Sequence, residues 1–163
     1  MTITYANIVE KLLIQARDTM RADSTLCTLL GTTTVLSKNL IFSGRPVNQK
    51  QGFTNPRVVC EIPIHDLSKY GDNPDGYNTD VIQFTVNGWI DETPIATSFG
   101  VMERIRNLFD NVEFNISEGG MGTFNAVKAE MINDPDKPAT MQCRVLINTN
   151  ILTKGWTKWE THL

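Results

Sequence analysis

Cysteine is scarce in this sequence of 163 residues, and histidine is scarcer still. The three cysteines, Cys27, Cys60 and Cys143, are odd in number and widely spaced, which argues against a disulfide framework and a CxxC-type metal site. We therefore expect reduced thiols inside a core. The two histidines, His65 and His162, belong to no HExxH motif and no Cys/His cluster, so we interpret them as surface side chains.

Long apolar runs are absent as well, and none approaches the length that spans a bilayer. The opening residues, MTITYANIVEKLL, are polar and acidic where a signal peptide requires a basic start and a continuous apolar stretch. Basic residues do not dominate, because the net charge is −3. General nucleic-acid binding requires a concentrated basic surface. We expect a protein that stays in the cytoplasm where it is made, without membrane or general nucleic-acid affinity.

No catalytic, cofactor-binding or metal-binding motif stands out. The glycine-rich segment 119–122 has no GK[ST] ending and no helix behind it, so it predicts a hairpin connection rather than a phosphate loop. The acidic turns at 72–80 and 134–136 do not supply the alternating oxygens and closing carboxylate of a calcium loop. Neither a nucleophile elbow nor a Cys/His pair is present. We expect a protein that is not an enzyme and holds no cofactor.

What is present is the composition of one globular domain, with 40% hydrophobic and 20% charged residues. Apolar residues at three- and four-residue spacing predict a helix over 5–20, and a short helical turn follows Ser24 and ends at Gly31. A second long helix begins at Thr93-Pro94 and closes near Asn111. Period-two patterns predict strands at 40–42, 57–64, 78–90, 112–116, 124–132 and 139–153, with a loop at 65–76.

This order of elements predicts one α+β domain over residues 1–163. Its sheet is mixed and mainly antiparallel, and it is packed by the N-terminal helix and by one long central helix. In the strand at 78–90 apolar and polar residues alternate, which indicates one covered face and one face open to water or a partner. The segment 139–153 is long for one strand. Either a bulge bends it, or part of it reaches beyond its own domain.

Charge is distributed unevenly along the chain. Between Gly31 and Cys60 there is no acidic residue, whereas the following segment to position 80 holds five acids against Lys69 alone. One interpretation is two solvated loops of opposite sign. The other is head-to-tail self-association, in which the basic loop 43–57 of one copy meets the acidic loop 65–80 of the next. Its candidate interface residues are Arg45, Lys50, Arg57, Asp66, Asp72, Asp75 and Asp80.

Two tryptophans, Trp156 and Trp159, lie in the C-terminal segment 154–163, with lysines beside them. Tryptophan contributes large contact area and is enriched where proteins meet. The segment is therefore a candidate interacting tail. The alternative is that the two rings close over the core of their own domain.

Several segments carry a family resemblance in this order: ADSTLCTLLG, LIFSGRPV, PRVVCEIPI, DVIQFTVNGWID, TPIATSFGVMERIRNLFDN and MQCRVLINTNI. Together they resemble the tail-terminator (tail-completion) proteins of long-tailed bacteriophages. The resemblance implies a structural virion protein, assembled in the host cytoplasm, that forms a hexameric ring at the head-proximal end of the tail tube. Such a ring stops tube polymerisation and joins tail to head. Its partners would be the tail tube protein and a head-completion connector, and DNA would pass through without specific binding.

Two other functions are compatible with the sequence. The first is another head–tail connector ring of the same virion, such as a head-completion or stopper protein. The second is a small α+β enzyme or nucleotide-binding domain, which would need convergent polar groups in a pocket. His65 and the segment 72–80 are where such a pocket would be sought.

Overall fold

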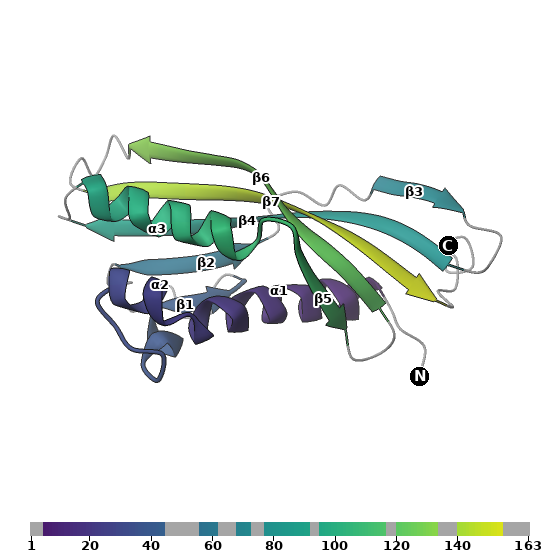
Figure 1. The fold of residues 1–163 in the computed structure, drawn as a ribbon, viewed down its shortest axis with the longest axis horizontal. Coiled ribbons are helices and arrows are strands. Elements are labelled where there is room, and N and C mark those ends of the chain that lie inside the picture. The colour runs from purple at the N-terminus through teal and green to yellow at the C-terminus, as the bar shows by residue number, and fades with distance from the viewer. Residues whose placement is uncertain are drawn as a thin grey trace.

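A computed structural model describes residues 5–44, 56–61, 68–72, 77–91, 95–116, 120–133 and 140–154. The helices are α1 (Tyr5–Ala22), α2 (Ser24–Leu29), the 3₁₀ helix η1 (Ser37–Asn39) and α3 (Ile95–Leu108) (Figure 1). The strands are β1 (Ile41–Ser43), β2 (Arg57–Glu61), β3 (Ser68–Asp72), β4 (Tyr77–Asp91), β5 (Val112–Ile116), β6 (Gly120–Asn133) and β7 (Thr140–Lys154).

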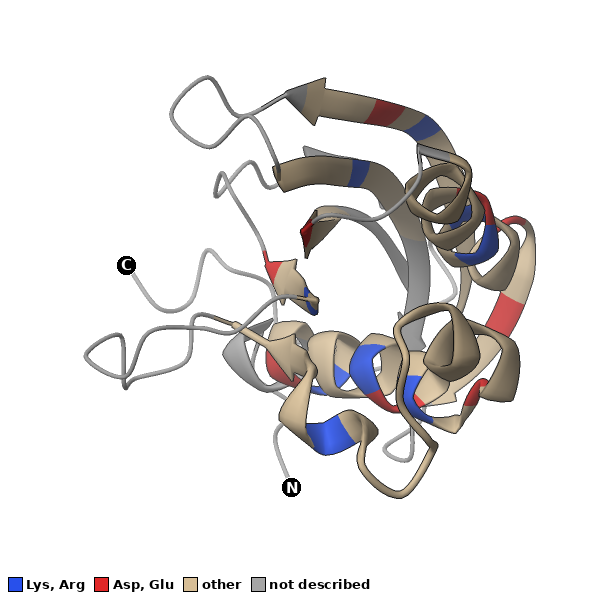
Figure 2. Ribbon diagram, turned by 90° about the vertical axis from the view of Figure 1, so that its left-hand side faces the viewer, with Lys and Arg blue, Asp and Glu red and all other residues tan. Residues whose placement is uncertain are grey.

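These strands form one sheet in the order β1-β2-β4-β7-β6-β5, and β3 pairs with β4. The pair β1 and β2 is parallel, whereas the other described pairs are antiparallel. The long strands β4, β7 and β6 cross the molecule, with α3 against β6 and β7 and α1 against β1 and β2 (Figure 1). Viewed along the long axis, the sheet curls around the helices (Figure 2). The α+β class and the mixed, mainly antiparallel sheet are confirmed.

The core lies between the helices and the inner face of the curled sheet. Each long element buries one stripe of apolar side chains, as the period of its sequence predicts. The fully covered members include Leu12, Ala16 and Met20 of α1, Val101 and Ile105 of α3, Phe84 and Val86 of β4, and Val145 and Ile147 of β7. No helix in the described part of the chain has the length and apolarity to cross a bilayer.

The short helix α2 is closed at both ends. At its start, the Leu26 amide donates to the Asp23 carboxylate at 2.7 Å. At its end, the amides of Gly31 and Thr32 donate to the carbonyls of Thr28 and Cys27 at 3.0 and 2.8 Å, with Gly31 at a φ of +69°. This is a Schellman motif, in which glycine adopts the left-handed conformation without steric cost. The prediction that Gly31 ends this helix is confirmed.

Part of the predicted loop 65–76 is wrong, because Ser68–Asp72 forms β3. Gly71 and Asp72 are typical of turns, so the local sequence predicts a loop. The segment is a strand because it pairs with β4. The register shift between Tyr70 and Asp72 accommodates Gly71. Likewise, Gly120 and Gly122 were expected in a hairpin connection but lie in β6, opposite Ile116 and Phe114 of β5.

The long C-terminal strand is confirmed as β7, and the bulge in its ladder lies in the neighbouring strand β6 rather than in β7 itself. All of its residues pair in continuous register with β4, so β7 carries no bulge against that strand and stays within the sheet. The irregularity belongs to the neighbouring strand β6, where Ala126 and Lys128 pair with successive residues of β7 and Val127 is the extra residue. An unpaired extra residue in one strand bends and twists a ladder locally.

Asp23 joins α2 to α3, and we expect its replacement to be costly. Nε and one terminal nitrogen of Arg104 donate to its carboxylate at 3.0 and 2.5 Å. The bond from Arg104, more than the bond from Leu26, lowers the pKa of Asp23 against the opposing effect of burial. Asp23→Ala should lower the free energy of unfolding by about 1–2 kcal/mol at neutral pH, measured by urea titration.

We expect the loss of stability caused by Asp23→Ala to depend on pH. Because the pKa of Asp23 is lowered in the folded state, its stabilisation is complete above the unfolded pKa of about 4 and is lost as the pH falls through the folded pKa. The difference between wild type and Asp23→Ala should therefore shrink below about pH 4. Asp18→Ala is the control, since Asp18 is 55% exposed and pairs with its neighbour Arg17. A difference of the same size at pH 7 and pH 2 would contradict this role.

Candidate assembly surfaces

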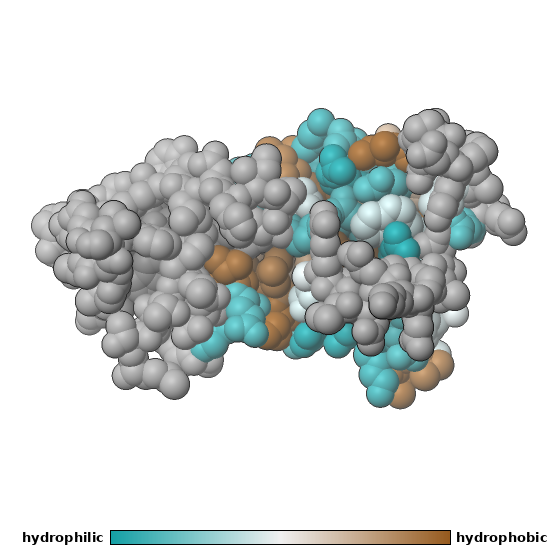
Figure 3. Space-filling model, turned by 180° about the vertical axis from the view of Figure 1, so that it is seen from behind, coloured by the Kyte–Doolittle hydropathy of each residue, from teal (hydrophilic) through white to brown (hydrophobic). Residues whose placement is uncertain are grey.

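The sheet face that points away from the helices is polar. In β4 the side chains of Phe84 and Val86 enter the core, so Thr85 and Asn87 lie on the opposite face. This confirms the alternation that the sequence predicts for this strand, but Thr85 and Asn87 are themselves buried, so this part of the face is not open to water as the sequence analysis expected. Seen from behind, the described part of this face is largely hydrophilic, with apolar residues among the polar ones (Figure 3). We call it the polar sheet face.

Asn87 is the centre of a hydrogen-bond network on the polar sheet face. Its amide nitrogen donates to Glu61 of β2 at 2.9 Å and to the hydroxyl of Thr85 at 3.2 Å. Its amide oxygen accepts from Nε of Arg144 on β7 at 3.0 Å and from Gln142 at 3.5 Å. The side chain is 1% exposed, so these partners satisfy a buried amide and tie three strands together.

The network continues to β6 through ion pairs. Glu130 lies opposite Arg144 in the ladder, with 3.6 Å between a carboxylate oxygen and a terminal guanidinium nitrogen. Lys128 donates to the same carboxylate at 2.7 Å. The bond from Lys128, more than the charge of Arg144, lowers the pKa of Glu130. The charged groups of this stretch are thus paired with one another across neighbouring strands.

Arg57 is the one predicted interface residue whose side chain the structure describes. It is the first residue of β2, where the sequence predicts that a strand begins, and it lies opposite Trp89 of β4. Its guanidinium carbon is 4.5 Å from the centroid of the Trp89 ring, a cation–π contact. Burial lowers the pKa of Arg57, against the charge of Asp91, which raises it. The sequence analysis missed Trp89, although its odd-numbered place in β4 puts it on the polar sheet face.

The remaining predicted interface residues are only partly covered by the structure. The backbone places Asp72 in β3 and Asp80 in β4, where Asp80 lies opposite Lys69. Outside the described residues are Arg45, Lys50, Asp66, Asp75, Trp156 and Trp159, together with His65, His162 and the tail beyond Lys154. Their roles stay predictions.

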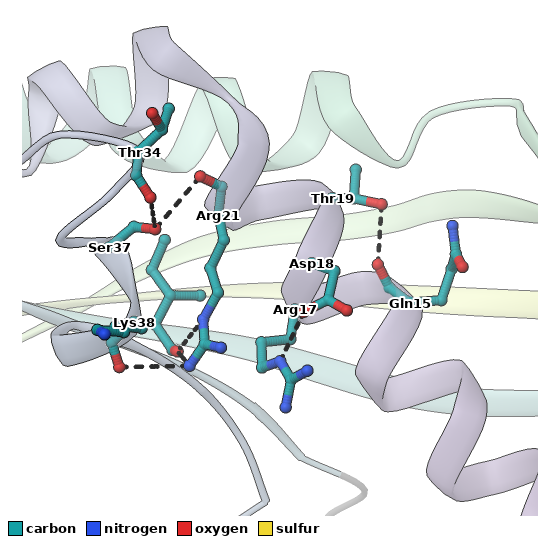
Figure 4. A network of polar contacts seen from close by, with 9 residues as sticks. Gln15, Arg17, Asp18, Thr19, Arg21, Thr34, Ser37 and Lys38 are labelled. Atoms are coloured by element: carbon teal, nitrogen blue, oxygen red, sulfur yellow. Dashed lines mark hydrogen bonds and ion pairs between the residues drawn. The ribbon is translucent and has the colours of Figure 1, made fainter.

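A second surface is the turn between α2 and β1. Its base is fixed by polar contacts with the last turn of α1 (Figure 4). The Ser37 hydroxyl donates to the Thr34 carbonyl at 2.7 Å and lies 3.3 Å from the Arg21 carbonyl. The Arg21 guanidinium donates to the Ile41 carbonyl at 2.6 and 2.9 Å and to the Lys38 carbonyl at 3.3 Å. Five hydrogen bonds from Ser37 and Arg21, most of them part-buried, therefore hold the base of this turn.

Two apolar side chains project from the fixed turn. Val35 is 77% exposed and its neighbour Leu36 is 53% exposed. The Leu36 amide donates to the Thr33 carbonyl at 3.1 Å, which closes the turn directly beneath them. We call Val35 and Leu36 the apolar tip. The sequence analysis missed it, because two apolar residues in a row do not reveal whether they face a core.

The three thiols are confirmed as core groups. Cys27, Cys60 and Cys143 are all buried and none is in a disulfide. Burial raises the pKa of each, that of Cys143 to about 11. The thiolate is the nucleophilic form of cysteine, so these side chains are suited to packing rather than to covalent chemistry. Within the described ranges, no three His, Cys, Asp or Glu side chains gather as metal ligands would.

Comparison with known proteins gives a likeness of fold. No protein-family model matches the chain, and no curated protein matches it either. A solved structure titled "Virion of native gene transfer agent (GTA) particle" contains a similar chain, with a TM-score of 0.69 and 15% sequence identity. The match covers 91% of this chain and 99% of that chain. At this identity the likeness shows a shared fold.

Proposed function

We propose that the chain is a structural subunit of a phage-like virion, and more specifically a tail terminator. In this role it forms a hexameric ring at the head-proximal end of the tail tube, stops tube polymerisation and joins tail to head. The observation that carries the proposal is the fold likeness, which spans nearly all of this chain and nearly all of the chain from the gene transfer agent virion. The sequence resemblance to tail terminators supplies the finer assignment.

The polar sheet face supports a role beside DNA. Lys128 and Arg144 both pair with the carboxylate of Glu130, and Arg144 also donates to Asn87, so neither cation is without a partner in the protein. Tight binding of a phosphate backbone requires free cations that displace counterions. Such a surface, on a chain of net charge −3, would let DNA move past without gripping it.

The proposal is tested in the virion from which the chain comes. Cryo-electron microscopy of tails should place the chain as one six-membered ring at the end of the tube that faces the head. Deleting its gene should give tubes of uncontrolled length that do not join heads, and supplying the wild-type chain should restore normal tails.

Two outcomes would overturn the assignment at different levels. A ring on the portal side, with tubes of normal length after deletion, would make the chain a head-completion or stopper protein instead. Its absence from purified particles would reject a virion role altogether. Mass measurement of the isolated ring separates six copies from twelve.

A further inference from the structure

Asn87 and Gly88 form an Asn-Gly pair within β4, and the sequence contains no other such pair. In an unfolded chain this pair is chemically labile, because glycine places no side chain near the reacting atoms and lets the backbone turn towards the asparagine side chain. The backbone nitrogen of Gly88 then attacks Cγ of Asn87. Asn87 is therefore a reactive residue whenever this part of the chain is unfolded.

The reaction at Asn87 is a deamidation. The Gly88 nitrogen forms a bond to Cγ of Asn87 while the bond from Cγ to the amide nitrogen breaks. The Gly88 amide gives up its proton, the departing amide nitrogen takes up a proton, and ammonia leaves. The chain then holds a cyclic imide, which water opens at either carbonyl group to give aspartate or isoaspartate. Water is the only co-reactant, and nothing is oxidised or reduced.

The folded sheet prevents this reaction. β4 is paired on both sides here, with Gly88 opposite Val58 of β2 and Cys143 of β7, so the backbone stays extended and cannot turn towards the side chain. The Asn87 amide is held by hydrogen bonds of 2.9–3.5 Å to side chains of β2, β4 and β7. Asn87 is also only 1% exposed, which keeps water away from it. Ring closure and ring opening both require the sheet to open.

The product of deamidation fits this site poorly. The Asn87 amide nitrogen donates to the Glu61 carboxylate at 2.9 Å, whereas aspartate at position 87 has no donor at neutral pH. Two carboxylates would then face each other at a buried position, which disfavours the charged form of both. Arg144 stays a partner only for the oxygen that it already contacts. Isoaspartate fits worse still, because its main chain runs through Cβ and lengthens a strand that is paired on both sides.

We propose that Asn87 is a deamidation site that folding closes. A chain held in the unfolded state converts Asn87 to aspartate or isoaspartate, and the converted chain is less stable in this sheet. The folded chain keeps Asn87 intact. Each period spent unfolded therefore removes copies from the pool that can fold, and the modification records that unfolding has occurred. The inference does not depend on a role in a virion.

Peptide mapping by mass spectrometry tests the protection by folding. Wild-type protein is kept at mildly alkaline pH, either folded in buffer or unfolded in guanidinium chloride, and conversion of Asn87 is followed with time. We expect conversion in guanidinium chloride and a rate in buffer at least about a hundredfold lower, because only a small fraction of folded protein is open at any moment. Asn125 and Asn148 are followed by alanine and threonine, so they should convert several-fold more slowly than Asn87 in the unfolded chain. Similar rates in the two solutions, or faster conversion at either control, would overturn the proposal.

Matched variants test the stability of the product. Asn87→Asp should lower the urea midpoint by about 1 M at neutral pH, because a donor is lost and Glu61 repels the new carboxylate. The control is Asn148→Asp, since the Asn148 side-chain oxygen accepts from Gln83 at 2.8 Å and aspartate accepts the same bond. We expect the control to lie within about 0.3 M of wild type. Adding Glu61→Gln to Asn87→Asp should restore most of the loss, because the new amide donates to the aspartate. A wild-type midpoint for Asn87→Asp, or no recovery in the double variant, is the contrary result.

Refolding of partly converted wild-type protein gives the same test if Asn87→Asp does not fold. Protein incubated in guanidinium chloride until part of it has converted is diluted into buffer, and the folded and unfolded fractions are separated and mapped. We expect chains converted at position 87 to be depleted several-fold from the folded fraction, while chains converted at Asn148 divide equally between the fractions. An equal division of the chains converted at position 87 would show that the product fits the sheet, and the proposal would be wrong.

Discussion

Phe109→Ala is expected to lower the free energy of unfolding by about 3–5 kcal/mol, the largest loss for any single substitution considered. Phe109 follows directly on α3 and is fully buried. Its ring meets those of Phe84 and Phe124 edge-to-face, with centroids 6.2 and 5.3 Å apart. Truncation would open a cavity where α3 meets the sheet, and urea unfolding at equilibrium measures the loss.

Phe99→Ala is the matched control for Phe109→Ala. Phe99 belongs to α3 and has the same side chain, but it is 48% exposed. We expect a change within about 0.5 kcal/mol, because little contact is lost at the surface. Similar losses for the two variants would mean that Phe109 does not anchor α3 in the way the ring geometry indicates.

Gly88→Ala is expected to destabilise the fold by about 1–3 kcal/mol through overpacking. Gly88 of β4 lies opposite Cys143 of β7, and a Cβ at position 88 would stand 2.7 Å from the Cys143 sulfur. Both residues are buried, so the neighbours have little room to move. Cys143→Ala removes that sulfur and with it the steric conflict. The double variant should therefore lose about 1 kcal/mol less free energy of unfolding than the two single variants lose together.

The control for this pair is Gly100→Ala in α3. A Cβ at position 100 would meet Leu29 at 3.5 Å, an ordinary contact. Alanine also suits a helix interior better than glycine, so Gly100→Ala should stabilise by about 0.5–1 kcal/mol. Strict additivity of Gly88→Ala and Cys143→Ala would show that the steric conflict is absorbed elsewhere.

Local patterns predict most of the fold. The three- and four-residue spacing places α1, and the alternation of apolar residues places β4 and β7, because each of these elements buries one face over the residues whose side chains the structure describes. The strand β3 escapes the same reasoning. Its sequence, SKYGD, has no apolar alternation, and it becomes a strand by pairing with β4. Tertiary pairing overrides local preference there.

The candidate surfaces are less predictable than the fold. Alternation indicates that Asn87 faces away from the core, but its burial depends on Glu61 and Arg144, which the register of β2 and β7 brings beside it. The apolar tip likewise depends on bonds between Arg21 of α1 and carbonyls 17 and 20 residues away. Such long-range pairing leaves no periodic signal in the chain.

The extra residue of β6 has a consequence for how chains of this fold can differ in length. Before Val127, the even-numbered Phe124 and Ala126 pack on the core, and after it the odd-numbered Ala129 and Met131 do. Deleting Val127 would therefore leave the same side chains of β6 on the core face on both sides of the deletion. Deleting one residue from the regular strand β7 would instead move the core side chains of half of that strand to the opposite face of the sheet. Position 127 is where related chains can shed or gain a residue, and an alignment of them should place its gap there.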